Sequence, residues 1–594
     1  MAPPPAAAAA LAACILAVAA TLAGADDPYR FFTWNVTYGS INPLGSTPQQ
    51  GILINGQFPG PRIDCVTNDN IIVNVFNNLD EPFLLTWNGI KQRKNSWQDG
   101  VLGTNCPIPP GANYTYKFQA KDQIGTFVYF PSVAMHRAAG GFGALNVYQR
   151  PAIPVPYPPP AGDFTLLVGD WYKAGHKQLR QALDAGGGGA LPPPDALLIN
   201  GMPSAAAFVG DQGRTYLFRV SNVGVKTSVN VRIQGHSLRL VEVEGTHPVQ
   251  NVYDSLDVHV GQSVAFLVTL DKAAQDYAVV ASARFSPGAA PLMATGTLHY
   301  SSAVSRAPGP LPAPPPEQAE WSMNQARSFR WNLTASAARP NPQGSFHYGT
   351  IATSRTLVLA NSAPVLAGQR RYAVNGVSFV VPDTPLKLVD NYNIANVIGW
   401  DSVPARPDGA APRSGTPVVR LNLHEFIEVV FQNTENELQS WHLDGYDFWV
   451  VGYGNGQWTE NQRTTYNLVD AQARHTVQAR SFRWNLTASA ARPNPQGSFH
   501  YGTIATSRTL MLASSAPVRR QRRVVRRPRH AAQARGQLQH RQCHRLGQRP
   551  GAAPRSGTPV VRLSLHEFIE VVFQNTENEL QSWHLDGYDF WVVG

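Results

Sequence analysis

The segment NIIVNVFNNL at residues 70–79 indicates the fold class, because it is a short run of β-branched and apolar residues that closes in turn-forming asparagines. Three further segments of this kind are separated from it by Gly, Pro, Asn and Asp turns: TFVYF at 126–130, SVAFLVTL at 263–270 and EFIEVVFQN at 425–433. Short strands punctuated in this way are typical of β-sandwiches and not of helical domains. We therefore predict an all-β chain.

Two proline-rich stretches divide the 594 residues into segments of domain size. PAIPVPYPPP at 151–160 and APGPLPAPPP at 307–316 are predicted to be extended linkers. They separate sandwich domains that we predict at 26–150, at 160–306 and at 326–478.

The first 25 residues are predicted to be a signal peptide, because an Ala/Leu-rich run ends in Ala-Gly-Ala at Ala25. A low-complexity cytosolic start is the alternative interpretation. No other stretch has the 18 or so unbroken apolar residues of a membrane span, and the C-terminal FWVVG offers no hydrophobic tail for a GPI anchor. We expect a secreted, extracellular protein with no transmembrane span and no GPI signal.

Candidate modification sites agree with secretion. Four Asn-X-Thr sequons are candidate glycosylation sites: Asn35, Asn113, Asn332 and Asn485. Cys65 and Cys106 both fall in the first predicted domain and are candidate partners in a disulfide. Two free buried thiols are the alternative.

The C-terminal region, residues 479–594, is a partial duplicate of the third domain. Residues 326–365 recur as 479–518, and residues 409–452 recur as 551–594, both nearly identically. Between these copies, residues 519–550 match a translation of the domain sequence shifted by one base. We predict that 479–594 forms no stable domain of its own and that 519–550 is disordered.

The out-of-frame segment also explains the net charge of +10. It contains eleven Arg and no acidic residue, so the rest of the chain is close to neutral. The basic run is therefore not a selected patch, and we expect no nucleic-acid partner. His540, Cys543 and His544 lie in the same segment and are rejected as metal ligands.

Five motifs across residues 27–478 resemble plant multicopper oxidases, in particular the SKU-type (skewed-growth) and pollen-type ascorbate oxidase homologues, a cell-wall family. The resembling segments are GILINGQFPGPRI at 51–63, LLTWNGIKQRKNSWQDGV at 84–101, GTFVYFPSVAMHRAAGGFGAL at 125–145, LLINGMP at 197–203 and LQSWHLDGYDFWVVGYGNGQW at 438–458. The resemblance implies tandem cupredoxin-like Greek-key β-sandwich domains, with the third truncated and partly duplicated.

The catalytic oxidases carry copper ligands inside these motifs, and this chain has other residues at most of those positions. In the H-W-H-G motif, Thr86 and Asn88 replace the two His. In the Y-H-x-H motif, Phe130 and Ser132 replace them. Two His at i and i+2 on a strand would face one metal cluster, so each pair of replacements removes a pair of ligands.

The third motif, H-P-x-H-x-H-G-H, keeps one matched position. His442 remains, whereas Gln439 and Asp444 stand where the resemblance implies His. The duplicate repeats this set as Gln581, His584 and Asp586. The H-C-H motif that would supply a blue-copper thiolate is absent from both copies. We therefore expect no metal, and His442 is predicted to be structural. His136 and His424 have no partner motif and are predicted to be structural or surface residues.

The resemblance and the replaced ligands together predict a non-catalytic, secreted glycoprotein of the plant cell wall, with a role in cell expansion or tip growth. We expect no catalytic residue and no cofactor, and partners that are wall polysaccharide or wall protein. A copper-binding, ascorbate oxidase-like oxidoreductase is one alternative, with copper as its cofactor. A mis-assembled gene model or pseudogene product is another.

Overall fold

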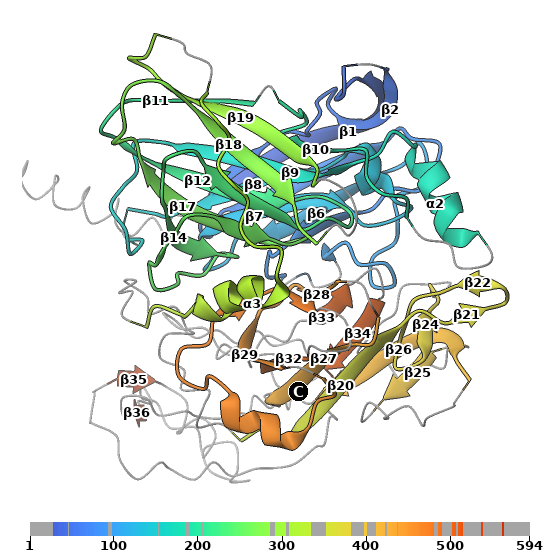
Figure 1. The fold of residues 1–594 in the computed structure, drawn as a ribbon. Helices are drawn as coiled ribbons and strands as arrows, with labels where there is room; N and C mark the ends of the chain where they lie inside the picture. The colour runs from blue at the N-terminus through green and yellow to red at the C-terminus, as the bar shows by residue number, and fades with distance from the viewer. Residues whose placement is uncertain are drawn as a thin grey trace, which may run out of the picture. The chain divides into compact units, whose positions relative to one another are not determined.

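The computed structural model describes most of the first 479 residues and short strands beyond them (Figure 1). The described residues are 28–45, 47–92, 95, 98–151, 154–185, 191–204, 206–285, 291–304, 308–333, 352–381, 397–400, 411–421, 425–435, 438–454, 456–479, 485–489, 502–505, 509–514, 536–538 and 561–563. The predicted signal peptide and the second-copy residues Gln581, His584 and Asp586 lie outside them, as does His424. Within these ranges, no helix has the length and apolar character needed to cross a membrane.

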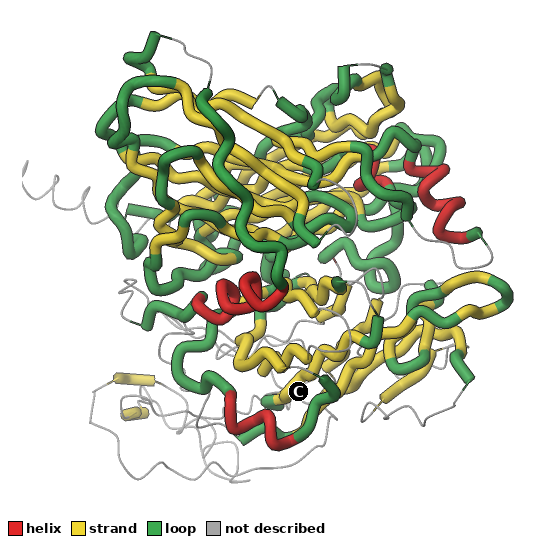
Figure 2. Tube along the Cα trace, viewed as in Figure 1, coloured by secondary structure: helices red, strands yellow, loops and turns green. Residues whose placement is uncertain are grey.

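Strands dominate the described chain, and helices are few (Figure 2). The α-helices are α2 (His176–Asp184) and α3 (Ala319–Ser328), and the 3₁₀ turns used below are η2 (His136–Ala139) and η4 (Glu460–Thr465). The four segments that predicted strands all lie in strands, so the all-β prediction is confirmed.

The first domain is a sandwich of two four-stranded sheets. One sheet has the order β2-β1-β4-β6, with bounds Gln49–Ile54, Tyr29–Ile41, Asn70–Asn77 and Asn113–Gln119. The other has the order β3-β8-β7-β5, with bounds Ile63–Val66, Gly143–Tyr148, Gly125–Pro131 and Leu85–Asn88. Alternate residues of β4 are buried, as a strand with one face on the core requires. The core between the sheets includes Trp34 and Trp87, whose ring centroids lie 5.8 Å apart.

The second domain has a six-stranded and a five-stranded sheet. The first has the order β10-β9-β12-β17-β14-β15, with bounds Ala196–Ile199, Asp163–Trp171, Thr215–Asn222, Ser263–Thr269, Leu238–Val243 and Val252–Tyr253. The second has the order β11-β19-β18-β13-β16, with bounds Ala206–Gly210, Met293–Tyr300, Asp276–Ala283, Val229–Ile233 and Leu256–Val258. Phe218 and Phe266 stack in its core with ring centroids 5.7 Å apart.

The third domain is built from strands that follow residue 354. They are β20 (Arg355–Ser362), β21 (Val365–Leu366), β22 (Gln369–Arg370), β23 (Ala373–Val374), β24 (Val377–Phe379), β25 (Val397–Trp400), β26 (Arg413–Leu421), β27 (Ile427–Asn433), β28 (Gln439–Asp444), β29 (Phe448–Gly454), β30 (Ala473–Arg474) and β31 (Thr476–Ala479). Its core includes Phe431 and Trp441, which stack at 4.8 Å between ring centroids.

The start of the duplicate contributes strands to the third domain. They are β32 (Asn485–Ser489), β33 (Gly502–Ala505) and β34 (Thr509–Ser514). They pair with β27, β28 and β26 respectively. Compact units accordingly divide at residue 515 and not at the predicted boundary of 479.

The second unit, Ala516–Gly594, is described only at two strands. β35 (Gly536–Leu538) pairs antiparallel with β36 (Val561–Leu563). Almost all of the out-of-frame segment 519–550 lies outside the described residues, so its predicted disorder stays a prediction.

Candidate functional site at the junction of the domains

The candidate copper positions of the first and third domains lie together. Thr86 is on β5 and Asp444 ends β28, and the Thr86 hydroxyl donates a hydrogen bond of 3.0 Å to Oδ1 of Asp444. Both side chains are buried. Asn88 shares its face of β5 with Thr86, as the two-residue period of a strand requires, and its Nδ2 donates to the carbonyl of Gly261 in the second domain at 2.9 Å. Residues 358 positions apart thus meet at one site.

Phe130 and Ser132, the replacements in the second motif, make other contacts. Phe130 packs in an apolar cluster at the border with the second domain, and the Arg137 guanidinium lies 3.7 Å from its ring centroid. The Ser132 hydroxyl donates to the carbonyl of Gly100 at 2.7 Å. Gly100 has a φ of +81°, and a Cβ there would lie 1.7 Å from the carbonyl oxygen of Leu85, so the loop packs directly on β5.

His442 is held at both ring nitrogens. Nδ1 lies 2.8 Å from the hydroxyl of Thr476, and Nε2 lies 2.9 Å from Oδ1 of Asp444. The ring is buried. The structural role predicted for His442 from the sequence stays a prediction. Gln439 starts the same strand and is half-buried, with its backbone paired to Ala479.

The sequence prediction missed a second imidazole at this site. His475 lies between β30 and β31, and its Nδ1 is 3.3 Å from Nδ1 of His442. Its Nε2 is buried without a hydrogen-bond partner and faces Gly89, where a Cβ would lie 2.6 Å away. No motif contains His475. The one available signal was an ionisable residue inside the apolar-polar alternation of ARHTVQ at 473–478.

Burial and neighbouring groups shift the pKa values of Glu244, His475 and Asp99 at this site. Burial would raise the pKa of Glu244, but the Arg474 charge and backbone donors outweigh it and hold that pKa below its ordinary value. Burial lowers the pKa of His475 to about 4, against the opposing charge of Glu244, so its imidazole is neutral at pH 7. Burial and the nearby Asp444 raise the pKa of Asp99 well above its ordinary value.

Among the described residues, thiols occur only in the first domain, at Cys65 and Cys106, and they are not bonded to each other. The predicted disulfide is therefore wrong. Cys65 points into the core from β3, where burial raises its thiol pKa to about 12, whereas the side chain of Cys106 is exposed.

The sequons differ in accessibility. Asn35 and Asn113 are exposed on β1 and β6 and remain predicted glycosylation sites. Asn332 is half-buried. The side chain of Asn485 lies outside the described residues.

Family models described as multicopper oxidase match residues 35–152, residues 162–303, and residues 383–499 with 526–594. The chain is 51% identical over 474 residues to an L-ascorbate oxidase homolog of Nicotiana tabacum, covering 77% of this chain and 84% of that protein. It is 50% identical over 480 residues to the monocopper oxidase-like protein SKU5 of Arabidopsis thaliana, covering 78% and 81%. An L-ascorbate oxidase of Cucurbita pepo var. melopepo is 28% identical, covering 79% and 91%.

Two solved structures share the fold. The multicopper oxidase Fet3p, described as functioning in iron import, aligns with a TM-score of 0.67 at 19% identity, covering 82% of this chain and 90% of that one. A laccase from Botrytis aclada aligns with a TM-score of 0.67 at 21% identity, covering 82% and 88%. These neighbours agree with the cupredoxin-type sandwiches that the sequence motifs implied.

Proposed function

Because the chain belongs to the multicopper oxidase family, next to plant L-ascorbate oxidase homologues and monocopper oxidase-like proteins, we propose that it is a secreted cell-wall glycoprotein that has lost copper-dependent oxidase chemistry. Its scaffold would serve in wall expansion or tip growth by binding wall polysaccharide or wall protein. Candidate glycosylation at the exposed Asn35 and Asn113 supports secretion.

The observation that carries this proposal is the buried hydrogen bond between Thr86 and Asp444. These are two positions at which the resemblance implies His ligands. A ligand must direct a free lone pair at the metal, but here the Thr86 hydroxyl and Oδ1 of Asp444 bond to each other, and only Oδ2 of Asp444 is without a partner. Asn88 likewise donates to the Gly261 carbonyl, and Ser132 to the Gly100 carbonyl. Hydroxyl and amide groups committed in this way do not fit a cluster of copper ions, which favours imidazole ligands.

The blue-copper site of the family needs a thiolate together with two imidazoles. In the described part of the third domain there is no cysteine, and the two thiols described elsewhere belong to the first domain. This donor set does not fit a blue-copper centre either. The proposal therefore includes no electron-transfer step.

A second candidate function is a copper-binding oxidoreductase that uses substitute ligands. The contact between Nδ1 of His442 and Nδ1 of His475, at 3.3 Å, favours it, because two neighbouring imidazoles and Asp444 could share one ion. Against it, both ring nitrogens of His442 already have partners. A third candidate is that the chain is a mis-assembled gene model or pseudogene product, which the frame-shifted residues 519–550 favour.

Copper analysis of the purified full-length chain tests the first two candidates. We expect well under one copper per chain, no thiolate-to-copper absorption band, and no ascorbate-dependent oxygen uptake, with the Cucurbita L-ascorbate oxidase as positive control. Stoichiometric copper with turnover would overturn the proposal. Copper with turnover, both lost in His475→Ser, would establish the second candidate, whereas copper that binds without turnover would leave the protein non-catalytic.

Localisation has a separate test. A reporter fused to residues 1–25 should reach the medium of plant cells, and the full-length protein should shift in mass on enzymatic removal of N-glycans. Retention in the cytosol would contradict secretion. Sequencing of the transcript across residues 478 and 479 decides whether the duplicate exists in the expressed protein.

A further inference from the structure

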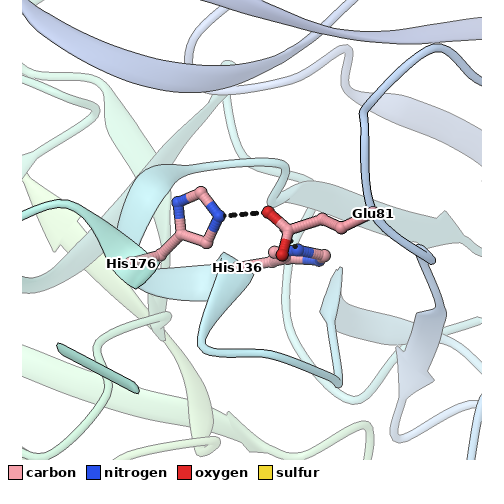
Figure 3. A group of neighbouring side chains, drawn as sticks. All are labelled: Glu81, His136 and His176. Carbon is pink, nitrogen blue, oxygen red and sulfur yellow. Dashed lines mark hydrogen bonds and ion pairs between the residues drawn. The ribbon is translucent and has the colours of Figure 1, made fainter. Parts of the chain in front are cut away.

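A buried Glu-His-His cluster lies apart from the candidate copper positions (Figure 3). Glu81 lies in the loop after β4, His136 begins η2, and His176 begins α2. Each offers one ligand atom, and these three atoms all lie within 4.8 Å of one another. The side chains of His136 and His176 are 0% and 3% exposed, and that of Glu81 is 20% exposed. Segments of the first and second domains thus converge on one point.

The carboxylate lies between the two imidazoles. Nε2 of His176 is 2.5 Å from Oε1 of Glu81, and Nε2 of His136 is 3.3 Å from the same oxygen. The two imidazole rings meet edge to face, with centroids 5.1 Å apart.

His136 is the unusual member of the cluster. Nδ1 is buried without a hydrogen-bond partner, and Nε2 reaches only Oε1 of Glu81, at 3.3 Å. More than nine in ten buried polar groups have a well-formed partner, so the unpartnered Nδ1 and the long Nε2 contact leave room for a ligand at this imidazole. Phe83 stacks on the ring at 5.7 Å between centroids and fixes its plane. The side chain is therefore held with Nε2 directed at the cluster.

The protonation states suit a metal. Burial lowers the pKa of His136 to about 4, so its imidazole is neutral at pH 7 and keeps a lone pair. For Glu81, burial would raise the pKa, but side-chain hydrogen bonds from Tyr38 and His176 hold it below its ordinary value. The Lys177 ammonium contacts both oxygens of Asp80 at 2.9 Å and lies 3.7 Å from Glu81. Neutral imidazole and ionised carboxylate are the forms that bind metal ions.

We propose that Glu81, His136 and His176 bind a zinc-class divalent metal ion that joins the first domain to the second. Zinc takes nitrogen and oxygen ligands at about 2.0–2.2 Å, and a tetrahedron of that size separates ligand atoms by roughly 3.3–3.5 Å. The distance from His136 to Glu81 already has this value. The hydrogen bond between His176 and Glu81 would open by about 1 Å. Calcium and magnesium are disfavoured, because both prefer oxygen ligands.

Water can supply the fourth ligand. A pocket of about 270 Å³ borders the cluster, and His176 and Ala139 are among the residues that line it. The pocket offers an access route for the ion and a place for a metal-bound water. A metal that binds only the folded state stabilises that state by an amount that grows with the logarithm of its free concentration once this exceeds Kd. The bound ion would therefore link the first domain to the second, and the stability that it adds would depend on the metal concentration of the medium.

Zinc binding to the full-length chain, stripped with chelator, tests the proposal. Calorimetric titration with ZnCl₂ at pH 7.4 and metal analysis after gel filtration should give one zinc per chain. His176→Gln and Glu81→Gln should each weaken affinity by at least about 10–100-fold. Circular dichroism checks that the variants are folded, and Tyr38→Phe, which removes a hydroxyl that contacts Glu81 and Asp80 but no proposed ligand, should retain the zinc.

A matched control is His299→Gln. His299 pairs with Asp276 at 2.6 Å and likewise combines imidazole and carboxylate, but the described residues provide no third ligand there. This variant should bind one zinc with unchanged affinity. Absence of stoichiometric zinc, or zinc retained equally by His176→Gln and Glu81→Gln, would overturn the proposal and leave a hydrogen-bonded Glu-His-His triad. Co²⁺ absorption typical of tetrahedral coordination, lost in the same two variants, gives an independent readout.

Discussion

Replacing Arg474 by Met removes the partner of a buried carboxylate that joins the second and third domains. Glu244 is 0% exposed at its side chain, and Oε1 accepts hydrogen bonds from Nε and Nη2 of Arg474 at 2.9 and 2.7 Å. Oε2 accepts the backbone N–H groups of His475 and Thr476 at 2.7 and 2.9 Å. The variant keeps these two bonds and leaves the charge without its counter-ion.

Breaking a buried ion pair on one side typically costs about 3–5 kcal/mol. For a domain of this size that corresponds to a fall in Tm of roughly 6–20 °C. Differential scanning calorimetry of the full-length chain at a fixed scan rate measures it. Glu244→Gln combined with Arg474→Met removes both charges and keeps acceptors for the backbone, and it should recover most of the loss.

The loss should also depend on pH. The pKa of Glu244 is depressed below its ordinary value of 4.5, so its stabilisation is present above pH 4.5 and disappears as the pH falls through the folded pKa. The Tm difference between wild type and Arg474→Met should therefore shrink on acidification.

Arg180→Met is the matched control, because Arg180 pairs with Asp184 one helical turn away on the surface and should contribute less than about 1 kcal/mol. A fall in Tm for Arg474→Met that is no larger than for Arg180→Met at pH 7 would refute the reasoning.

Three further predictions concern the first domain and the domain junction. Gly100→Ala should lower the free energy of unfolding in urea by more than about 2 kcal/mol, because the φ of +81° and the close carbonyl of Leu85 leave no space for a Cβ. A change under about 0.5 kcal/mol would contradict this packing. In a chain with Cys14 and Cys543 replaced by Ser, Ellman's reagent should label Cys106 rapidly and Cys65 only on unfolding, since burial raises the Cys65 pKa to about 12. Two slow thiols or none would contradict the correction of the disulfide. His475→Gln should flatten the fall of Tm between pH 6.5 and 4, because the depressed pKa of about 4 makes protonation of His475 destabilising over that interval. An unchanged slope of Tm against pH would exclude this contribution.

The strands could be predicted from sequence because their signal is local. The alternation in residues 70–79 depends only on which side chains face the core, and β4 buries them in that order. The family motifs identified Thr86 and Asp444 as replaced ligand positions, but the hydrogen bond between them was not predicted, since 358 positions separate them.

Other features depend on side-chain orientation or on pairing between distant segments. Neither can be derived from the spacing of residues along the sequence. His475 reaches His442 only because β28 pairs with β31, so that His442 lies opposite Thr476. Cys65 and Cys106 share a domain but point in different directions. His136 was predicted to be structural or at the surface, and the cluster became visible only once the start of α2 was placed beside η2.

A chain that ended at residue 478 would lack the strands that the duplicate contributes to the third domain. Without β32, β33 and β34, the strands β27, β28 and β26 would each lose a hydrogen-bonded neighbour. An exposed strand edge recruits strands from other molecules, which leads to intermolecular β-pairing and aggregation. The repeated sequence thus acts as an intramolecular donor strand, the arrangement by which some chaperones complete an unfinished sheet.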